Sequence, residues 1–394
     1  MTDELCASTS VIRLSAAHIV ADIYLPVITA ILPLFITTYG FSYFLAGLLV
    51  TAYNVTSSMM QPVFGWMSDR FGVVIHVSVS LLISAFFISA MGLSGNFYLL
   101  LVFAALAALG HAAFHPNALS LVARFCNAGN RGRLISIFVV GGNLGYAIGP
   151  ILAAVIVTWY GLPGLPLLII PAAVMALVLW KSFPRRKPGL PVIKEPFSGI
   201  QPRLPYLPVL ALFSASTLRA WVVFCAIAFF PPLLIARGLS LVMADLLVTG
   251  MLLSGVAGQV VAGYLSDQYG RKEFVIAGSL LAVPSFLGFI FLTGLASLIS
   301  LMVFGFALWS GLAVMLAMAH EMVPGKVGLT SGIMLGAALG VGGLGVAVTG
   351  ILADMYSLET ALYLLPFLIL AACVIIYYLP YSWKTREKVP AVKV

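Results

Sequence analysis

The sequence predicts an all-α membrane protein of twelve transmembrane helices, arranged as two six-helix bundles that repeat one another. Three observations indicate this fold. The 394 residues are 62% hydrophobic and only 8% charged, whereas a soluble domain carries about 25% charged residues. Apolar stretches long enough to cross a bilayer, which takes roughly 20 residues, follow one another with short polar loops between them. The polar octapeptide Gly65–Gly72 (GWMSDRFG) recurs as Gly263–Gly270 (GYLSDQYG), each time between two apolar stretches.

The apolar stretches place the twelve helices along the chain. Backbone N–H and C=O groups in lipid must be paired within their own segment, so spans of this length are helices. We expect them at residues 12–38, 43–66, 73–94, 97–124, 132–160, 164–183, 206–236, 241–263, 273–293, 297–321, 327–356 and 359–380.

Residues 184–205 separate the two halves of the chain. The stretch contains six prolines and five basic residues, which exclude a helix that spans the bilayer. We therefore predict a cytoplasmic linker here. It joins an N-terminal six-helix bundle (residues 1–183) to a C-terminal six-helix bundle that ends in a short cytoplasmic tail (residues 206–394).

The basic residues predict the orientation in the membrane. Of the 20 lysines and arginines, all except Arg219 and Arg237 fall on one side of the predicted membrane. Basic residues in short loops collect on the cytoplasmic side, so both termini are predicted to be cytoplasmic, which requires an even number of helices. We expect a multi-pass monomer in the cell (inner) membrane. The formal net charge of +8 then indicates contact with the lipid bilayer and no nucleic acid, because the basic residues form no continuous face.

The repeat extends into the fifth and eleventh helices. Gly142 and Gly145 recur 200 residues later as Gly342 and Gly345. With six helices in each half the copies have the same orientation, so the halves are parallel repeats about an axis along the membrane normal. Small residues let helices approach and slide, and these four glycines are predicted to be helix-packing surfaces on which the halves rock.

Several stretches resemble the major facilitator superfamily. The second repeated loop ends in Gly270-Arg271-Lys272 and is similar to the superfamily's loop signature, whereas the first ends in Gly72-Val73-Val74 and lacks the basic pair. Phe114-His115-Pro116 and Gly141–Gly145 (GGNLG) are similar to stretches of the fosmidomycin-resistance type of drug exporter. The resemblance covers the whole chain and implies the major facilitator fold. It implies no particular substrate, because related exporters differ in what they carry.

Ionisable residues inside a predicted span are the candidates for function, because each costs about 2.5–3.5 kcal/mol on insertion scales. Asp22 lies well inside the first helix, and His18, four residues earlier, shares its face. A carboxylate beside an imidazole can hold and release a proton, since its pKa depends on burial and on nearby charge. We predict a proton-coupling role for both residues; the alternative is a structural hydrogen bond near the cytoplasmic end.

His111 and His115 repeat the four-residue spacing in the fourth helix. Pro116 follows directly and is expected to bend the helix and to free a carbonyl group. The ordinary pKa of histidine, about 6.5, suits a proton relay, so His115 is predicted to couple protons together with Asp22. A neutral histidine that bonds across helices is the alternative. No third ligand lies near this pair in the sequence, and we predict no metal site.

Arg219 lies deep in the seventh helix and is almost the repeat counterpart of Asp22. The two side chains are therefore expected to face each other across a central cavity and to pair when the cavity is empty, so that an anionic substrate would compete for Arg219. The alternatives are a pair that locks the halves together or an arginine bonded to carbonyl groups. Tyr24, Asn143 and His115 complete the predicted substrate cavity.

The repeated loops are predicted to form a cytoplasmic gate. Asp69 and Asp267 can accept hydrogen bonds at a helix N-terminus and can pair with Arg70 or Arg271; solvated loop charges are the alternative. Glu321 ends the tenth helix and is assigned to the same gate. The acidic residues near the opposite face are predicted to be outer-surface or helix-end charges, namely Asp245, Asp354 and Glu359.

These residues predict a secondary transporter that works by alternating access around a site near the midplane of the membrane. We expect a proton-coupled antiporter that exports a small amphipathic or anionic compound, with drug resistance as its phenotype. The alternative is a uniporter or a proton symporter that imports a nutrient or metabolite. The proton gradient drives the transport and no cofactor is expected. The sequence has no nucleophile–base arrangement and no ATP-binding motif that would indicate an enzyme.

Overall fold

The computed structural model describes residues 2–71, 75–126, 131–183, 205–323 and 330–382. Within these ranges the chain is helical and contains no strand. Ten helices are long and apolar enough to cross a membrane. Val77–Leu93 is a shorter apolar helix, and α3 (Tyr43–Phe71) is long enough but more polar along its length. With these two, the described chain supplies the twelve predicted spans and confirms the all-α membrane fold.

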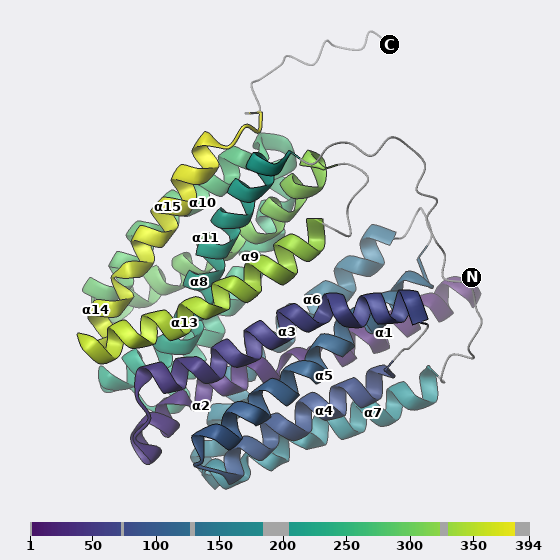
Figure 1. The fold of residues 1–394 in the computed structure, drawn as a ribbon, viewed down its shortest axis with the longest axis horizontal. Helices are drawn as coiled ribbons and strands as arrows, with labels where there is room; N and C mark the ends of the chain where they lie inside the picture. The colour runs from purple at the N-terminus through teal and green to yellow at the C-terminus, as the bar shows by residue number, and fades with distance from the viewer. Residues whose placement is uncertain (1, 72–74, 127–130, 184–204, 324–329, 383–394) are drawn as a thin grey trace.

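The helices of the first half gather on one side of the molecule, and those of the second half gather on the other (Figure 1). The first half consists of α1 (Thr2–Asp22), α2 (Tyr24–Tyr39), α3, α4 (Val77–Ala90), η1 (Met91–Leu93), α5 (Phe97–Ala123), α6 (Arg131–Tyr160), η2 (Leu162–Leu168) and α7 (Ile169–Ser182). The second half consists of α8 (Tyr206–Ala236), α9 (Leu241–Tyr269), α10 (Arg271–Phe291), α11 (Gly294–Met322), η3 (Gly332–Ala337), α13 (Ala338–Met355), α14 (Leu358–Leu362) and α15 (Leu364–Tyr378). Residues 184–204 of the predicted linker lie outside the described ranges.

The first predicted span is two helices rather than one. α1 ends at Asp22 and α2 begins at Tyr24. The cause is in the sequence, because Pro26 has no N–H with which to bond the carbonyl of Asp22, four residues earlier. The last span is divided in the same way at Tyr363, between α14 and α15. The break in the first span places Asp22 at the end of a helix and not in its interior.

The repeated glycines hold helices together inside each half. At Gly145 an added Cβ would lie 2.0 Å from the backbone oxygen of Ile19, and at Gly142 it would lie 2.5 Å from the His18 ring. Gly342 lies against Ala220 and Gly345 against Trp221 in the same manner. These glycines therefore pack α6 on α1 and α13 on α8. They are not the surfaces on which the two halves meet, which differs from the expectation of rocking surfaces.

The two halves meet mainly through α3 against α13 and α6 against α9. Twelve crossings return the chain to the side on which α1 begins. We call this the termini side and the opposite side the far side. On the far side, Asp354 at the end of α13 accepts hydrogen bonds from the backbone N–H groups of Tyr43 (2.7 Å) and Phe44 (2.9 Å) at the start of α3. Farther along α3, the Thr51 hydroxyl donates to the Gly343 carbonyl (2.8 Å). The halves are therefore joined on the far side.

Replacing Asp354 should weaken this junction. Asp354→Ala removes both acceptors at the N-terminus of α3. Loss of a helix cap costs about 0.5–2 kcal/mol, so the ratio of closed to open far side should fall roughly 2- to 30-fold. Spin labels are attached at Tyr39→Cys and Tyr356→Cys after the native cysteines have been replaced. Pulsed electron paramagnetic resonance then measures the distance between the labels, which reports the separation of the halves on the far side. Asp354→Asn keeps one acceptor oxygen and should show a smaller change; an Ala variant with the native distance distribution would contradict this role.

Candidate functional site

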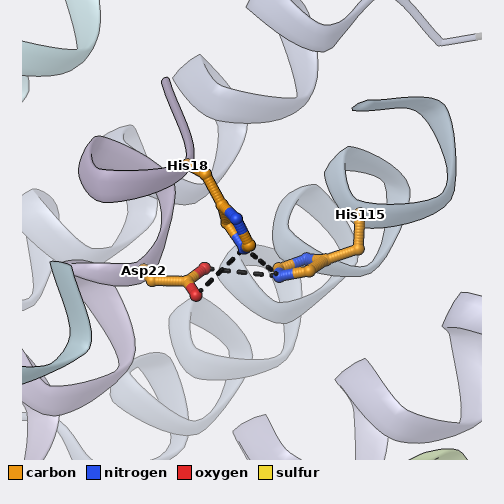
Figure 2. A group of neighbouring side chains, drawn as sticks. All are labelled: His18, Asp22 and His115. Atoms are coloured by element: carbon orange, nitrogen blue, oxygen red, sulfur yellow. Dashed lines mark hydrogen bonds and ion pairs between the residues drawn. The ribbon is translucent and has the colours of Figure 1, made fainter. Parts of the chain in front are cut away.

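Three ionisable side chains from two helices converge inside the first half. Asp22 is the last residue of α1, His18 lies one turn before it, and His115 projects from α5 (Figure 2). His18 Nε2 lies 3.2 Å from Asp22 Oδ2, and His115 Nε2 lies 3.3 Å from Asp22 Oδ1. The two Nε2 atoms are 3.2 Å apart. Every one of the three groups thus touches the other two, and we call them the Asp22 cluster.

The other ring nitrogen of each histidine is bound to the backbone. His18 Nδ1 lies 2.8 Å from the Phe138 carbonyl oxygen, and His115 Nδ1 lies 3.0 Å from the His111 carbonyl oxygen. A carbonyl oxygen only accepts, so both Nδ1 atoms carry hydrogen and donate. In a neutral imidazole the remaining nitrogen is then an acceptor. Both Nε2 atoms therefore point lone pairs at the Asp22 carboxylate and at each other, unless a cation or a proton lies between them.

The surroundings of the Asp22 cluster are largely apolar and closely packed. The ring of Phe138 stacks on His18, with 4.1 Å between centroids and 21° between planes. Gly142 lies against both His18 and Asp22, and a Cβ there would be 2.6 Å from Asp22 Oδ2. The side chains of His18, Asp22 and His115 keep 8%, 13% and 24% exposure. The cluster is thus shielded, and His115 is its most exposed member.

His111 is the second histidine of α5 near the Asp22 cluster. Its Nδ1 lies 3.9 Å from Asp22 Oδ1, which is too long for a hydrogen bond. Its ring stands 5.6 Å from that of Tyr53, a fully buried tyrosine of α3. The ligand-type atoms of His18, Asp22 and His115 lie within 4.8 Å of one another, so by distance alone the cluster could hold either protons or a small cation.

Two predicted cavity residues occupy different environments. The Asn143 side-chain amide of α6, half-buried, donates to Gln259 Oε1 of α9 (3.0 Å). This bond crosses between the halves one residue from Gly142, so Asn143 lies at the contact between α6 and α9. Tyr24 is fully buried, and its hydroxyl donates to the Leu168 carbonyl of η2 (2.9 Å). It ties α2 to η2 and does not line an open cavity.

Arg219 does not pair with Asp22. Its guanidinium is 1% exposed and points into the second half, where it donates to Ser279 Oγ (2.7 Å) and to the Leu308 carbonyl (2.5 Å). Gly311 of α11 makes room for it, since a Cβ there would lie 2.7 Å from a guanidinium nitrogen. The alternative named from the sequence, an arginine bonded to carbonyl groups, describes this environment; a cavity-lining anion site does not.

Part of the predicted gate forms inside the second half. Arg271 at the start of α10 bonds Asp267 (2.9 Å) and Glu321 at the end of α11 (2.6 Å). The Tyr381 hydroxyl donates to the same Glu321 carboxylate. Burial, and next the Glu321 carboxylate, raise the pKa of the Tyr381 phenol, so it stays protonated as a donor. These residues join three helices of one half on the termini side.

The first repeated loop is less fully described. Arg70 is exposed in the last turn of α3. The side chain of Asp69 and residues 72–74 lie outside the described part of the chain, so its predicted capping contact stays a prediction. Sequence reasoning did not single out Gln259, although its amide in the middle of an apolar helix is the signal that could have found it. It also interpreted Asp245 as an outer-surface or helix-end charge; the residue does lie near the start of α9, but the structure buries its side chain completely.

The chain is similar to transporters of known sequence and structure. The family profile described as "Major Facilitator Superfamily" matches residues 14–230 and 212–393. The "Fosmidomycin resistance protein" of Escherichia coli (strain K12) is 31% identical over 381 residues, covering 92% of this chain and 91% of that protein. The "Hexuronate transporter" of Bacillus subtilis (strain 168) is 26% identical and covers 81% of each chain.

A solved structure shares the fold. It is a bacterial homologue of the human lysosomal transporter Spinster, in an inward-facing and unoccupied conformation. Its TM-score is 0.80 at 18% identity, covering 94% of this chain and 96% of that one. A profile that spans both halves, a relative above 30% identity over nearly the whole length, and the twelve-span fold agree. The chain belongs to the major facilitator superfamily, and it is a multi-pass membrane transporter rather than an enzyme.

Proposed function

We propose that this protein is a proton-coupled antiporter that exports a small amphipathic or anionic compound by alternating access. The observation that carries the proposal is the Asp22 cluster, in which two histidines with Nδ1 bound to carbonyl groups direct Nε2 toward one carboxylate. Three lone-pair-bearing groups at 3.2–3.3 Å repel one another. One proton on either Nε2 converts the repulsion into charge-assisted hydrogen bonds. The cluster is therefore a proton-binding site in this arrangement.

The position of the cluster connects proton binding to movement. Asp22 ends α1 at the break before α2, and Gly142 brings α6 against it. Next to Gly142, Asn143 reaches Gln259 of the other half. A proton that enters or leaves the cluster changes the charge directly beside this contact between the halves. A substrate with polar or anionic groups that meets Asn143 and Gln259 would thus sense, and alter, the protonation of Asp22, His18 and His115.

The drug-resistance relative supports export as the direction of transport. The Escherichia coli protein of 31% identity is named for resistance to fosmidomycin, which export would produce. Import by proton symport, or uniport, is the second candidate, and the hexuronate transporter of 26% identity favours it. We further propose cytoplasmic termini, since the described basic residues Arg70, Lys181 and Arg271 lie at helix ends on the termini side. A cell (inner) membrane location and a monomeric protein are part of the same proposal.

Transport into proteoliposomes tests both the coupling and its sign. Radiolabelled fosmidomycin and glucuronate serve as anionic probes, and tetraphenylphosphonium serves as a cationic one. An acidic interior should drive uptake by an antiporter, because protons leave as the probe enters. An acidic exterior would drive uptake by a symporter instead. If the uptake of a probe were the same with an acidic interior, an acidic exterior and no pH gradient, the protein would be a uniporter and the proposed coupling would be wrong.

A further inference from the structure

A second carboxyl group is buried far from the Asp22 cluster. Asp245 lies in the second turn of α9, near the far side, and its side chain has 0% exposure. Neither carboxylate oxygen has a hydrogen-bond partner among the described residues. Thr249, one turn later, is 6% exposed and its hydroxyl is also without a partner there. Buried polar groups are nearly always paired, so two unpaired groups on one helix require an explanation.

These two residues belong to the face of α9 that meets the other half. Residues 245, 249, 252, 256 and 259 follow one another at spacings of four and three, which aligns them on one side of a helix. The last of them, Gln259, bonds Asn143 of α6 across the halves. Asp245 lies about 21 Å farther along the same face, at 1.5 Å per residue. It is therefore buried at the seam between the halves, toward the far side.

No described charge is placed to balance an ionised Asp245. On that side, Arg237 pairs with Glu359 (2.7 Å) and donates to the Ile290 carbonyl (3.0 Å). The helices packed against α9 are α6, α8, α10 and α11. Most of the described ionisable side chains on these four helices lie in mid-helix or on the termini side, and Tyr160 is exposed at the end of α6. The full set is Tyr146, Tyr160, Tyr206, Arg219, Cys225, Arg271, Lys272, Glu273, His320 and Glu321.

An unpaired carboxylate is excluded from such a place by its desolvation, whereas a protonated carboxyl is tolerated. We propose that Asp245 is a second proton-binding site, separate from the Asp22 cluster, and that it must take up a proton before the far side can close. When the halves part on the far side, the seam opens and water reaches the group, which releases its proton there. Closure buries the group again and takes the proton from far-side water, so the step is a plain protonation of the carboxylate.

The sign of the effect follows from this exchange. Protonation favours the closed seam, so raising the pH should favour the open one. Once the open form has ionised, each further pH unit lowers the closed-to-open ratio about tenfold. The inference rests on the proposed function only in assigning the movement to transport; the protonation of Asp245 itself does not depend on it.

The proposal is tested by the distance distribution between spin labels at Tyr39→Cys and Tyr356→Cys, measured in nanodiscs at pH 6 and pH 8 by pulsed electron paramagnetic resonance. The closed population should fall with rising pH in the parent protein, by up to about tenfold per unit in the closed-to-open ratio. Asp245→Asn mimics the protonated group and should stay closed at both pH values. Asp22→Asn should keep the part of the pH dependence that Asp245 contributes, although it loses proton-driven transport, which separates this inference from the proposed function.

Three results would overturn the proposal. The first is an Asp245→Asn variant that retains the parent's pH dependence. The second is an Asp22→Asn variant that loses this dependence altogether. The third is closure at pH 8 restored by sodium in place of potassium, which would assign the site to a metal cation.

Discussion

Asp22→Asn should reduce accumulation driven by a pH gradient to the level of protein-free liposomes. Asparagine keeps the shape of the side chain and one acceptor oxygen, but it cannot take up or release a proton. His18 and His115 would then lack the anion that helps to hold a proton between them, so the site should bind a proton far more weakly. The measurement is uptake of labelled fosmidomycin into proteoliposomes under an imposed pH gradient, compared with exchange of the same probe in the absence of a gradient.

Exchange without a gradient should survive in this variant, because Asn143 and Gln259, the proposed substrate contacts, are unchanged. Glu359→Gln is the matched control: it also neutralises one carboxylate, but Glu359 lies on the far side, where it pairs with Arg237. That variant should retain coupling. Gradient-driven accumulation that persists in Asp22→Asn would show that the Asp22 cluster is not the proton carrier.

Arg219→Ala should destabilise the second half by about 2–5 kcal/mol, the range for removing a large buried side chain. The loss has two sources: a cavity beside Gly311, and the hydrogen bonds to Ser279 and to the Leu308 carbonyl. Thermal unfolding of purified protein in detergent, followed by size-exclusion chromatography, measures it. Because the guanidinium is 1% exposed, the effect should be on stability and not on substrate affinity.

Arg219→Met separates the two sources. Methionine fills much of the same volume, so it removes the cavity, but it still leaves Ser279 and the Leu308 carbonyl without their donor, which costs about 1–3 kcal/mol. We expect this variant to unfold between the Ala variant and the parent protein, and to transport anionic probes within a few-fold of the parent rate. A stable Met variant that no longer binds anionic probes, while cationic probes still bind, would return Arg219 to the role of an anion ligand.

The sequence repeat predicted the fold correctly but predicted the direction of the Arg219 side chain wrongly. The repeat counterpart of Asp22 is position 220, where Ala220 lies against Gly342. Arg219 stands one residue earlier, and one residue turns a helix by about 100°. The side chain therefore points at α10 and α11 instead of toward the first half. A prediction of helices from apolar stretches and a repeat remains correct when the alignment is wrong by one residue. A prediction of side-chain direction does not.

The Asp22 cluster could be predicted only in part. Four-residue spacing puts His18 and Asp22 on one face, and the polar character of His115 marked it as a candidate. The contact of His115 with both of them depends on how α5 packs against α1, which no local pattern contains. The break at Asp22 was readable from Pro26, because a proline removes the hydrogen bond four residues back. The burial of Asp245 could not be predicted from the sequence. Its position near the start of a helix does not tell which neighbouring helices cover the side chain.

The hydrogen bonds of Arg219 also bear on how the chain enters the membrane. Its described partners, Ser279 and Leu308, follow it by 60 and 89 residues. At about 5–20 residues per second, the ribosome makes Leu308 only some 5 to 20 seconds after Arg219. During that interval α8 carries an unaccompanied cation, and insertion is favoured only by the apolar residues around it, which keep the mean hydropathy at 2.0 even with Arg219 included. The seventh span should therefore depend on the insertion machinery to shelter it until α10 and α11 have been made.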